Sequence, residues 1–349
     1  MRLFIFLLLL AATPMYAQTI FRVMTYNVEN LFDVKDNPDK EDNDFLPTGN
    51  RYWNTHRYYF KQQQLAKVIT AAGEWNAPAL VGLCEVENDS VLFDLTQRTS
   101  LRAQEYRYVI TSHSDKRGIN VALLYQRDQF RYLHHQSIPI RFSKQQHKST
   151  REILHVSGEM ITRDTLDVFL CHFPSRYGGE KESEQDRFDA ATTLRKTCDS
   201  IIQARTNPQI LIMGDFNDTP KNKSLSQVVG ASPSNEKVQV EASYINLIPK
   251  SLTKGVEGTH KHQGEWNQLD HIIVNRKLME PNSRMQPLPE SIQIFSPSFL
   301  LTKDKTWRGI RPFRTYYGYK YERGFSDHLP IIADFYLHLS TNKTKIHEH

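Results

Sequence analysis

The chain has 349 residues, of which 39% are hydrophobic and 24% are charged, and its formal net charge is +5. This balance excludes a disordered chain and is typical of a globular protein with one large domain or two ordinary ones. A net charge this small, at this length, does not by itself indicate a polyanionic partner. Cys84, Cys171 and Cys198 exclude a disulfide scaffold, because an odd number leaves at least one thiol free. Cys84 and Cys171 lie in strand-like runs whose alternation turns them toward the core, so we expect buried thiols.

Residues 1–17 predict a secretory signal. Arg2 precedes an unbroken apolar run from Leu3 to Leu10, and residues 14–17 give a cleavage end. The run is too short to cross a bilayer. We therefore expect export to the periplasm or the medium, a mature chain that begins near Gln18, and no stable membrane insertion.

Downstream, the spacing of apolar residues predicts strands that alternate with helices. Residues 20–28 and 79–86 have the composition of strands, and apolar positions recur at helical spacing over 54–75. Asp89 is the expected cap of a helix over 90–99, and an amphipathic helix is expected over 182–205. The other strands are expected over 106–111, 121–125, 130–135, 153–160, 167–172, 210–214, 269–274 and 329–336.

The chain has no Gly/Ser-rich or Pro-rich linker and no repeat, so we expect one domain over 18–340 and a polar tail over 341–349. The acidic loop over 33–50 lacks the ligand spacing of a calcium-binding loop. Segments 228–244 and 281–301 are weakly patterned. No Cys/His cluster has the spacing of a zinc site.

Polar side chains that can hold metals or protons lie at the ends or starts of several predicted strands. In Ile210–Asp218, four apolar residues end at Gly214, and an extended backbone there would place Asp215 and Asn217 on one face. Each residue alone is explained as an ordinary turn or strand end. Their recurrence favours a functional site instead, and its candidates are Asn27, Glu85, His172, Asp215, Asn217, Asp270, Asp327 and His328.

Five short motifs, in order along the chain, resemble the DNase I-like endonuclease/exonuclease/phosphatase superfamily. The resemblance implies an α/β (α+β) fold, a four-layer α/β/β/α sandwich in which two mixed β-sheets are flanked by helices. It covers nearly the whole mature chain. The motifs are Thr25-Tyr-Asn-Val, Cys84-Glu-Val, Gly214-Asp-Phe-Asn-Asp, Leu269-Asp-His-Ile and Ser326-Asp-His-Leu-Pro.

The resemblance also implies a metal site. Glu85 would be the principal Mg²⁺ ligand, helped by Asn27 and Asp327, with Mn²⁺ or Ca²⁺ as substitutes. The residue types agree, because Mg²⁺ prefers one or two carboxylates plus water and substrate phosphate.

The resemblance implies catalytic roles for the remaining candidates. Asp215 and Asn217 would hold the attacking water and a phosphate oxygen. Asp270 would orient His328 and favour its imidazolium form. His172 matches a second histidine of the DNase I-like branch. Whether Asp215 or a histidine takes the proton from water stays open, as does the number of metal ions.

Two further stretches are candidate substrate contacts. Arg151 matches a phosphate-binding arginine of DNase I-like proteins, although a surface arginine on a strand is an equal alternative. Ser175 and Arg176 follow His172 in a glycine-bearing loop, where they can bind phosphate. The basic and aromatic segment 303–325 suits nucleic acid, and equally suits a loop anchored by aromatic residues.

These observations predict an exported, Mg²⁺-dependent phosphoesterase that hydrolyses phosphodiester bonds by in-line attack of water and is most similar to a nuclease. Its partner would be a phosphate-ester substrate, with nucleic acid as a candidate, and no protein partner is indicated. One alternative is a phosphatase or phospholipase C-type hydrolase of lipid, inositol or sugar phosphates. Another is a non-catalytic binding protein on the same fold.

Overall fold

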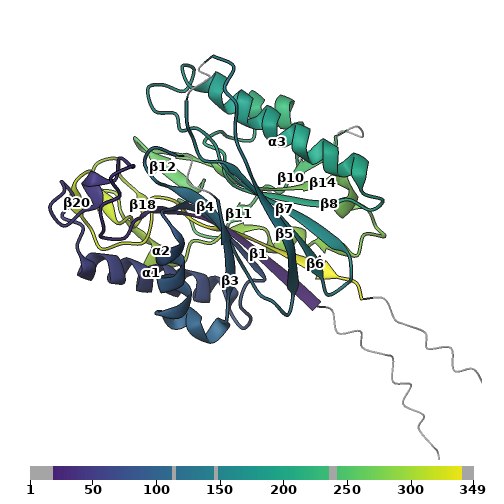
Figure 1. The fold of residues 1–349 in the computed structure, drawn as a ribbon, viewed down its shortest axis with the longest axis horizontal. Helices are drawn as coiled ribbons and strands as arrows, with labels where there is room; N and C mark the ends of the chain where they lie inside the picture. The colour runs from purple at the N-terminus through teal and green to yellow at the C-terminus, as the bar shows by residue number, and fades with distance from the viewer. Residues whose placement is uncertain (1–18, 112–114, 145–147, 236–241, 340–349) are drawn as a thin grey trace, which may run out of the picture.

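The computed structural model describes residues 19–111, 115–144, 148–235 and 242–339. Two large mixed sheets lie face to face, with helices on their outer sides (Figure 1). The predicted four-layer α/β/β/α sandwich is therefore confirmed. The predicted signal sequence (1–17) and polar tail (341–349) lie outside the described residues.

The first sheet has eight strands and is built around β1 (Thr19–Leu31). β1 pairs in parallel with β2 (Leu80–Val86) and antiparallel with β21 (Ile331–Leu337). β1 therefore places the predicted site residues of the first two motifs beside each other. The other strands of this sheet are β3 (Arg107–Ile110), β4 (Asn120–Tyr125), β11 (Lys250–Ser251), β15 (Met285–Pro287) and β16 (Gln293–Ile294).

The second sheet has seven strands, and its centre fixes the register of three predicted site residues. β7 (Thr165–His172) pairs in parallel with β8 (Gln209–Asp215), and β14 (Asp270–Asn275) pairs antiparallel with β8. The ends of β7 and β8 and the start of β14 therefore share one edge. The other strands are β5 (Phe130–Ile138), β6 (Ile153–Met160), β9 (Ala231–Pro233) and β10 (Tyr244–Asn246).

Helices α1 (Thr55–Gly73) and α2 (Asp89–Gln97) lie on the first sheet, and α3 (Glu184–Ala204) lies on the second (Figure 1). The cap of α2 is Asn88, whose side chain accepts a hydrogen bond from the Val91 amide, so the prediction of Asp89 as the cap was wrong by one residue. None of the helices in the described part of the chain is both long and apolar enough to cross a bilayer.

Three apolar layers hold the sandwich together. The layer between the sheets includes Leu123, Leu170 and Met213, and the other two lie under α1 with α2 and under α3. Cys84 and Cys171 are buried free thiols, as predicted, and Cys198 is buried as well. Burial of the apolar side chains in the three layers supplies most of the stabilisation of a domain this size.

Short elements connect the layers, and several of them lie in segments without a clear sequence pattern. Strands of two or three residues are too short to show an alternation. Three short hairpins lie outside the two large sheets: β12 (His260–His262) with β13 (Glu265–Asn267), β17 (Leu301–Lys303) with β18 (Ile310–Pro312), and β19 (Tyr316–Tyr317) with β20 (Lys320–Tyr321). The short helices are η1 (Asn43–Phe45), η2 (Ser100–Gln104), η3 (Ser224–Val229), η4 (Arg276–Met279), η5 (Pro289–Ser291) and η6 (Ser298–Leu300).

Candidate active site

Polar strand ends from both sheets meet at one edge of the sandwich. In the second sheet, Asp215 is directly paired with His172 on one side and with Asp270 on the other. Across the sandwich, the Asn27 amide nitrogen donates a hydrogen bond to Asp215 Oδ2 at 3.0 Å and to Glu85 Oε1 at 3.2 Å. The fold thus brings together five predicted site residues that lie far apart in the sequence.

Two unusual backbone conformations make this approach possible. Gly214 has φ +138°, and a Cβ atom there would lie 1.9 Å from the Cys171 carbonyl oxygen, so only glycine fits between β7 and β8. Glu85 has φ +67°, at a register shift between β2 and its neighbour β4. A non-glycine residue in this region is strained, and such strain is common where a side chain is aimed into a site.

The carboxylates are held by hydrogen bonds that fix their orientation. Glu85 Oε2 accepts a hydrogen bond from the Asn30 amide at 2.8 Å, and Asp215 Oδ1 accepts one from the Asn217 amide at 2.8 Å. Burial raises the pKa of Asp215 to about 7, with the charge of Asp270 adding to burial and that of His328 opposing it. Asp215 can therefore gain or lose a proton near neutral pH.

The pKa values of the two predicted catalytic histidines are shifted in opposite directions. Burial, followed by the charges of Arg151 and Arg117, lowers the pKa of His172 well below its usual value. Its Nε2 atom lies 3.6 Å from Asp215 Oδ2 and 3.8 Å from Glu85 Oε1.

His328 is the cationic member of the pair. Its Nδ1 atom lies 2.7 Å from Asp270 Oδ2, and its Nε2 atom lies 3.9 Å from Asp215 Oδ2. Burial disfavours the charge, but the carboxylates of Asp270 and Asp215 outweigh burial and raise the pKa of His328 well above its usual value. The cluster therefore contains a neutral imidazole and an imidazolium at the same carboxylate.

The three residues predicted to bind Mg²⁺ lie in the neighbouring strands β1 and β2 and in the segment that leads into β21. Glu85 supplies a carboxylate, the kind of ligand that Mg²⁺ takes together with water and phosphate. Its contacts in the structure are the Asn27 amide nitrogen, the Asn30 backbone amide and His172 Nε2. Asn27 faces Glu85 through its amide nitrogen while its Oδ1 atom accepts a hydrogen bond from the Glu29 amide, so its role as a ligand requires the amide to turn.

Asp327 lines the same opening as Glu29 and Asn30, and its Oδ2 atom lies 4.0 Å from His260 Nε2. The hydroxyl of its neighbour Ser326 donates a hydrogen bond to the Asn27 carbonyl at 2.7 Å.

A family model described as endonuclease/exonuclease/phosphatase family matches residues 22–338. The chain belongs to this family. Its members are hydrolases of phosphate esters that generally depend on a divalent metal, and the acidic and histidine groups of this chain could bind one. The fold of the chain is that of a phosphoesterase.

Solved structures of this family share the fold at low sequence identity. D. rerio TDP2, humanized by 14 mutations, is 15% identical with a TM-score of 0.55, over 90% of this chain and 98% of its own. An endonuclease/exonuclease/phosphatase family protein from Bacteroides thetaiotaomicron is 14% identical with a TM-score of 0.57, over 93% and 100%. A mannosyl-6-phosphatase from the same organism is 14% identical with a TM-score of 0.55, over 90% and 99%. Among curated proteins, none matches the chain.

Arg151 lies near His172, and its side chain is held in place by hydrogen bonds. Only 5% exposed, it donates from Nη2 to the Phe173 carbonyl at 2.6 Å, and its Nη1 lies 3.3 Å from Asp115 Oδ2. Its Nε atom has no hydrogen-bond partner. It is therefore a buried arginine rather than the surface arginine of the alternative prediction, and its role in binding phosphate stays a prediction.

Arg176 contacts the protein with every part of its guanidinium group. Nε donates to the Asn217 carbonyl at 2.7 Å, and Nη1 and Nη2 lie 3.1 Å from Glu180 Oε2 and 3.4 Å from Asp218 Oδ1. Nη2 also donates to Asn222 Oδ1 at 3.2 Å. This placement ties the loop that follows β7 to Asn217, and direct contact with substrate stays a prediction.

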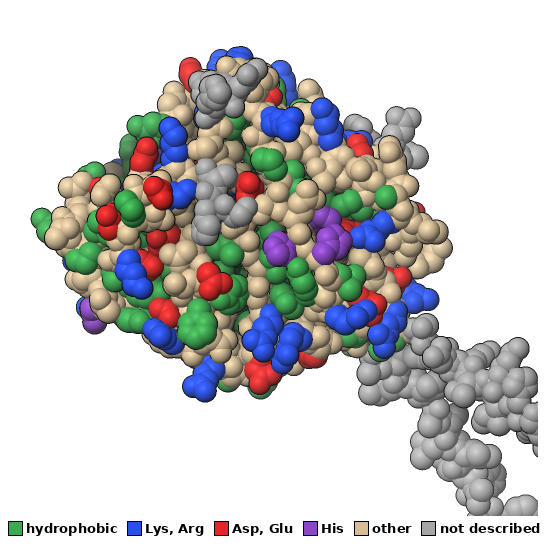
Figure 2. Space-filling model, viewed as in Figure 1, with side chains coloured by type: hydrophobic (Ala, Val, Ile, Leu, Met, Phe, Trp, Pro, Cys, Tyr) green, Lys and Arg blue, Asp and Glu red, His purple; other side chains and the backbone are tan. Residues whose placement is uncertain are grey.

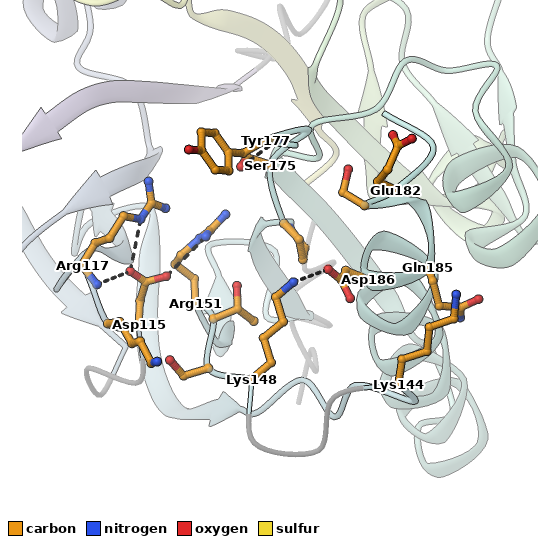
Figure 3. Close-up of a pocket in the computed structure, with 15 residues that line it drawn as sticks. Asp115, Arg117, Lys144, Lys148, Arg151, Ser175, Tyr177, Glu182, Gln185 and Asp186 are labelled. Atoms are coloured by element: carbon orange, nitrogen blue, oxygen red, sulfur yellow. Dashed lines mark hydrogen bonds and ion pairs between the residues drawn. The ribbon is translucent and has the colours of Figure 1, made fainter. Parts of the chain in front are cut away.

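A basic recess of about 580 Å³ is lined by Arg151 and by Pro174 and Ser175, which closely follow His172 in the sequence (Figure 3). Arg151 and Arg117 both approach Asp115 on one wall, and Lys148 pairs with Asp186 on the other. The predicted contact Ser175 lies on the rim beside Tyr177. The basic side chains that line the recess are Lys116, Arg117, Lys144, Lys148 and Arg151, and the acidic ones are Asp115, Glu182 and Asp186.

A second recess, of about 370 Å³, lies on the Asp327 side between the short hairpins. Most of its basic residues are neutralised, because Arg311 contacts both Glu322 oxygens at 2.9 and 2.7 Å and Lys261 lies 3.0 Å from Asp304. Arg314 is different, since its Nε atom has no hydrogen-bond partner. In segment 303–325 itself, Tyr316 and Phe325 are buried in the apolar layer under α1 and α2. A role of the segment in binding nucleic acid stays a prediction.

The sequence reasoning missed two residues of the site. His260 lies on β12 with its ring centroid 4.7 Å from that of His328, and the alternation His260-Lys-His262 was the available signal. Glu29 accepts hydrogen bonds from the Thr315 and Tyr316 amides at 2.7 and 3.2 Å, and so attaches the hairpin segment to β1. Glu29 lies within β1, and nothing in the sequence pattern distinguishes it from the other residues of that strand.

Proposed function

We propose that the chain is an exported, Mg²⁺-dependent hydrolase of phosphodiester bonds, most similar to a nuclease. The observation that carries this proposal is the contact of Asp215 with Asn27, together with the proximity of His172 and His328 to the same carboxylate. A binding protein has no need for one carboxylate of raised pKa between a neutral and a cationic histidine.

Two recesses flank the cluster, and this arrangement favours a diester over a monoester. The basic recess lies on the His172 side and the smaller one on the Asp327 side. A diester carries groups on both sides of phosphorus, whereas a monoester carries one. Lys and Arg side chains beside the cleavage site suit a chain of phosphates.

The residues of the chain suit in-line attack of water on phosphorus. Mg²⁺ bound at Glu85 would neutralise charge on the phosphate oxygens. Asp215, with a pKa of about 7, would accept the proton of the attacking water, and the Asn217 amide holds Asp215 in place. The imidazolium of His328, held by Asp270, would donate a hydrogen bond to a non-bridging oxygen.

Proteins that share this fold act on different phosphate esters, so the fold alone does not determine the substrate. One related structure is D. rerio TDP2 with a single-strand DNA product, and another is a mannosyl-6-phosphatase. Both share the fold at 14% identity. On the face seen in Figure 2, basic and acidic side chains of the described residues alternate without a continuous basic stripe.

The test compares substrates of the purified mature chain. Single-stranded oligonucleotide, plasmid DNA, RNA, sphingomyelin, bis(p-nitrophenyl) phosphate and mannose 6-phosphate are each incubated with Mg²⁺ and then with EDTA. We expect hydrolysis of the diesters, loss with EDTA and recovery when Mg²⁺ is restored. Faster hydrolysis of the monoester, or hydrolysis that survives chelation, contradicts the proposal.

Export is tested separately. The N-terminal sequence and the cellular fraction of the natively expressed protein are measured. A mature chain that begins near Gln18, found in the periplasm or the medium, is the expected result. A chain that keeps Met1 and stays in the cytoplasm contradicts export.

A further inference from the structure

Arg187 is a buried arginine near the start of α3. The other buried residues of this helix are small or apolar, namely Ala190, Ala191, Leu194 and Cys198. The side chain of Arg187 is 0% exposed, and its Nε atom lies 2.8 Å from Oδ1 of Asp218, which is 1% exposed. Apolar side chains of similar volume often stabilise a core as well as a buried ion pair does. Stability alone therefore gives little reason for an ion pair at this place.

The pair of Arg187 and Asp218 joins the loops that follow two neighbouring strands of the site. Arg187 Nη2 donates to the Glu180 carbonyl at 2.8 Å and Nη1 donates to Ser183 Oγ at 2.7 Å, so Arg187 holds the end of the loop after β7. Asp218 belongs to the loop after β8, and its Oδ2 atom accepts a hydrogen bond from Ser224 Oγ at 2.6 Å. The ion pair therefore attaches one loop to the other.

Asp218 directly follows Asn217, whose backbone lies in the left-handed region at φ +51°. Such a conformation is uncommon for a residue other than glycine and persists where surrounding contacts hold it. In this conformation, the Asn217 amide donates to Asp215 Oδ1 at 2.8 Å, and its side-chain nitrogen donates to the Phe173 carbonyl at 3.1 Å. The backbone at Asn217 thus sets the orientation of the Asp215 carboxylate.

Two further contacts hold the same stretch of backbone. His271 Nε2 donates to the Asp218 carbonyl at 2.9 Å, and Arg176 Nε donates to the Asn217 carbonyl at 2.7 Å. The side chain of Arg176 is 25% exposed, so water competes for its contacts. Because Arg187 is fully buried, water cannot take its place beside the Asp218 carboxylate.

We infer that Arg187 is a positioning residue for hydrolysis. Through Asp218 it keeps Asn217 in the left-handed conformation, and so keeps Asp215 oriented toward the attacking water. Arg187 itself has no contact with substrate in this role, and the inference rests on the proposed function. A purely structural ion pair makes a different prediction, because its loss would lower stability without a particular loss of kcat.

A second arginine at the other end of α3 provides the matched comparison. Arg205 Nε lies 2.6 Å from Oδ2 of Asp167, which is also 0% exposed. Arg187→Met and Arg205→Met each remove one guanidinium and leave a buried aspartate, so both should lower Tm. With bis(p-nitrophenyl) phosphate and saturating Mg²⁺, only Arg187→Met should lower kcat, by about 10 to 100 fold, with KM within a factor of about two. Equal kcat in the two variants overturns the inference.

A double variant separates positioning from stability. Arg187→Met combined with Asp218→Asn removes the carboxylate that the single variant leaves without its buried partner, so Tm should recover part of its loss. The link between the loops is still missing, and kcat should therefore stay low. If kcat recovers together with Tm, Arg187 acts on stability alone and the inference is overturned.

Arg187→Lys provides a milder change if the methionine variant does not fold. Lysine keeps a positive charge beside Asp218, but one ammonium cannot contact Asp218, Ser183 and Glu180 in the way that the planar guanidinium does. We expect kcat to fall in the same direction, by roughly threefold to tenfold, with KM little changed. A lysine variant with the kcat of the wild type overturns the inference.

Hydrogen exchange of backbone amides tests the link without any measurement of activity. In Arg187→Met, the amides of segments 174–183 and 216–224 should exchange roughly tenfold faster or more, because both loops open locally more often. In Arg205→Met, exchange in these two segments should equal that of the wild type. Unchanged exchange in Arg187→Met overturns the inference. A wild type without hydrolytic activity refutes the proposed function instead, and the exchange measurement still decides whether Arg187 holds the two loops.

Discussion

The two sides of the catalytic cluster are built in different ways. On one side, His172 and Asp215 lie at the ends of strands of seven or eight residues whose register fixes their positions. On the other, His260 belongs to a hairpin with strands of three residues, which is held by a few bridges to its neighbours. The register of the sheet therefore determines where the residues of the strand side lie. Individual side-chain and backbone contacts determine where those of the hairpin side lie. Substitutions should reveal this difference.

The largest effect is expected on the strand side. Asp215→Asn removes the carboxylate that both histidines face, and we expect kcat on a phosphodiester to fall by about 10² to 10⁴ fold. The free energy of unfolding should not fall, because burial already disfavours the charged form of this side chain. Kinetics with saturating Mg²⁺ and thermal unfolding measure the two quantities. A loss of less than about tenfold removes Asp215 from the chemistry.

The next largest effect is expected at Glu29, which attaches the hairpin side to β1. Glu29→Ala leaves the buried Thr315 and Tyr316 amides without their acceptor, and we expect the free energy of unfolding to fall by about 2 to 4 kcal/mol. Glu29→Gln keeps one acceptor oxygen, so one of the two amides keeps its partner and the loss should be smaller than that of Glu29→Ala. Urea unfolding of the two variants makes the comparison. Equal losses would show that the charge of Glu29, rather than its hydrogen bonds, attaches the hairpins.

The strand side could be predicted from sequence because its signal is local. Gly214, Asp215 and Asn217 follow an apolar run long enough to recognise as a strand, and the family motifs then bring Glu85 and His328 to the same edge. The four-layer fold follows from that resemblance, since alternating apolar runs do not specify which sheet a strand joins. The cap at Asn88 was missed by one residue, because Asn88 and Asp89 are equally good caps in sequence.

The hairpin side could not be predicted for a physical reason. Strands of two or three residues have no period, and their positions depend on contacts with distant residues such as Glu29 and Lys61. Lys61 lies in α1 and donates to the carbonyls of Glu29 and Phe325 at 3.2 and 2.6 Å. A buried lysine in an amphipathic helix gives no sign of these partners. His260 was missed because its distance from His328 depends on the bridge between their backbones.

Asp167, in β7 away from the catalytic cluster, should affect the stability of the strand side without affecting activity. Asp167 is buried, with Oδ2 2.6 Å from Arg205 Nε and Oδ1 2.9 Å from His155 Nε2. Burial favours protonation, but hydrogen bonds from His155, Arg205 and Ser157 outweigh burial and lower the pKa of Asp167. Asp167→Asn should cost about 3 kcal/mol at neutral pH without changing kcat.

The pH dependence of that loss has a definite sign. Because the pKa of Asp167 is lower in the folded state, its contribution to stability is present above the unfolded pKa of about 3.9 and is lost as the pH falls through the folded value. Urea unfolding of wild type and Asp167→Asn should therefore differ most near pH 7 and converge in acid. A difference that stays constant into acid would assign the loss to packing.

The smallest effect tests how Arg176 acts on the strand side. A direct contact with phosphate predicts that Arg176→Ala raises KM about tenfold with kcat unchanged. The geometry favours a different result, because Nε holds the Asn217 carbonyl and the other nitrogens contact Glu180 and Asp218. We expect kcat to fall about tenfold with KM within a factor of about two, as Asn217 and the water that it would hold lose their position.

Arg176→Lys is the matched control for that result. Lysine keeps the positive charge but cannot reach Asn217 and Asp218 together with one planar group. If Arg176 positions Asn217, the lysine variant should be as slow as the alanine variant. If it binds phosphate through charge alone, lysine should restore most of KM. A restored KM would place Arg176 among the residues that touch substrate, and the loop after β7 would then resemble the hairpin side, where single side chains rather than strand register determine the function.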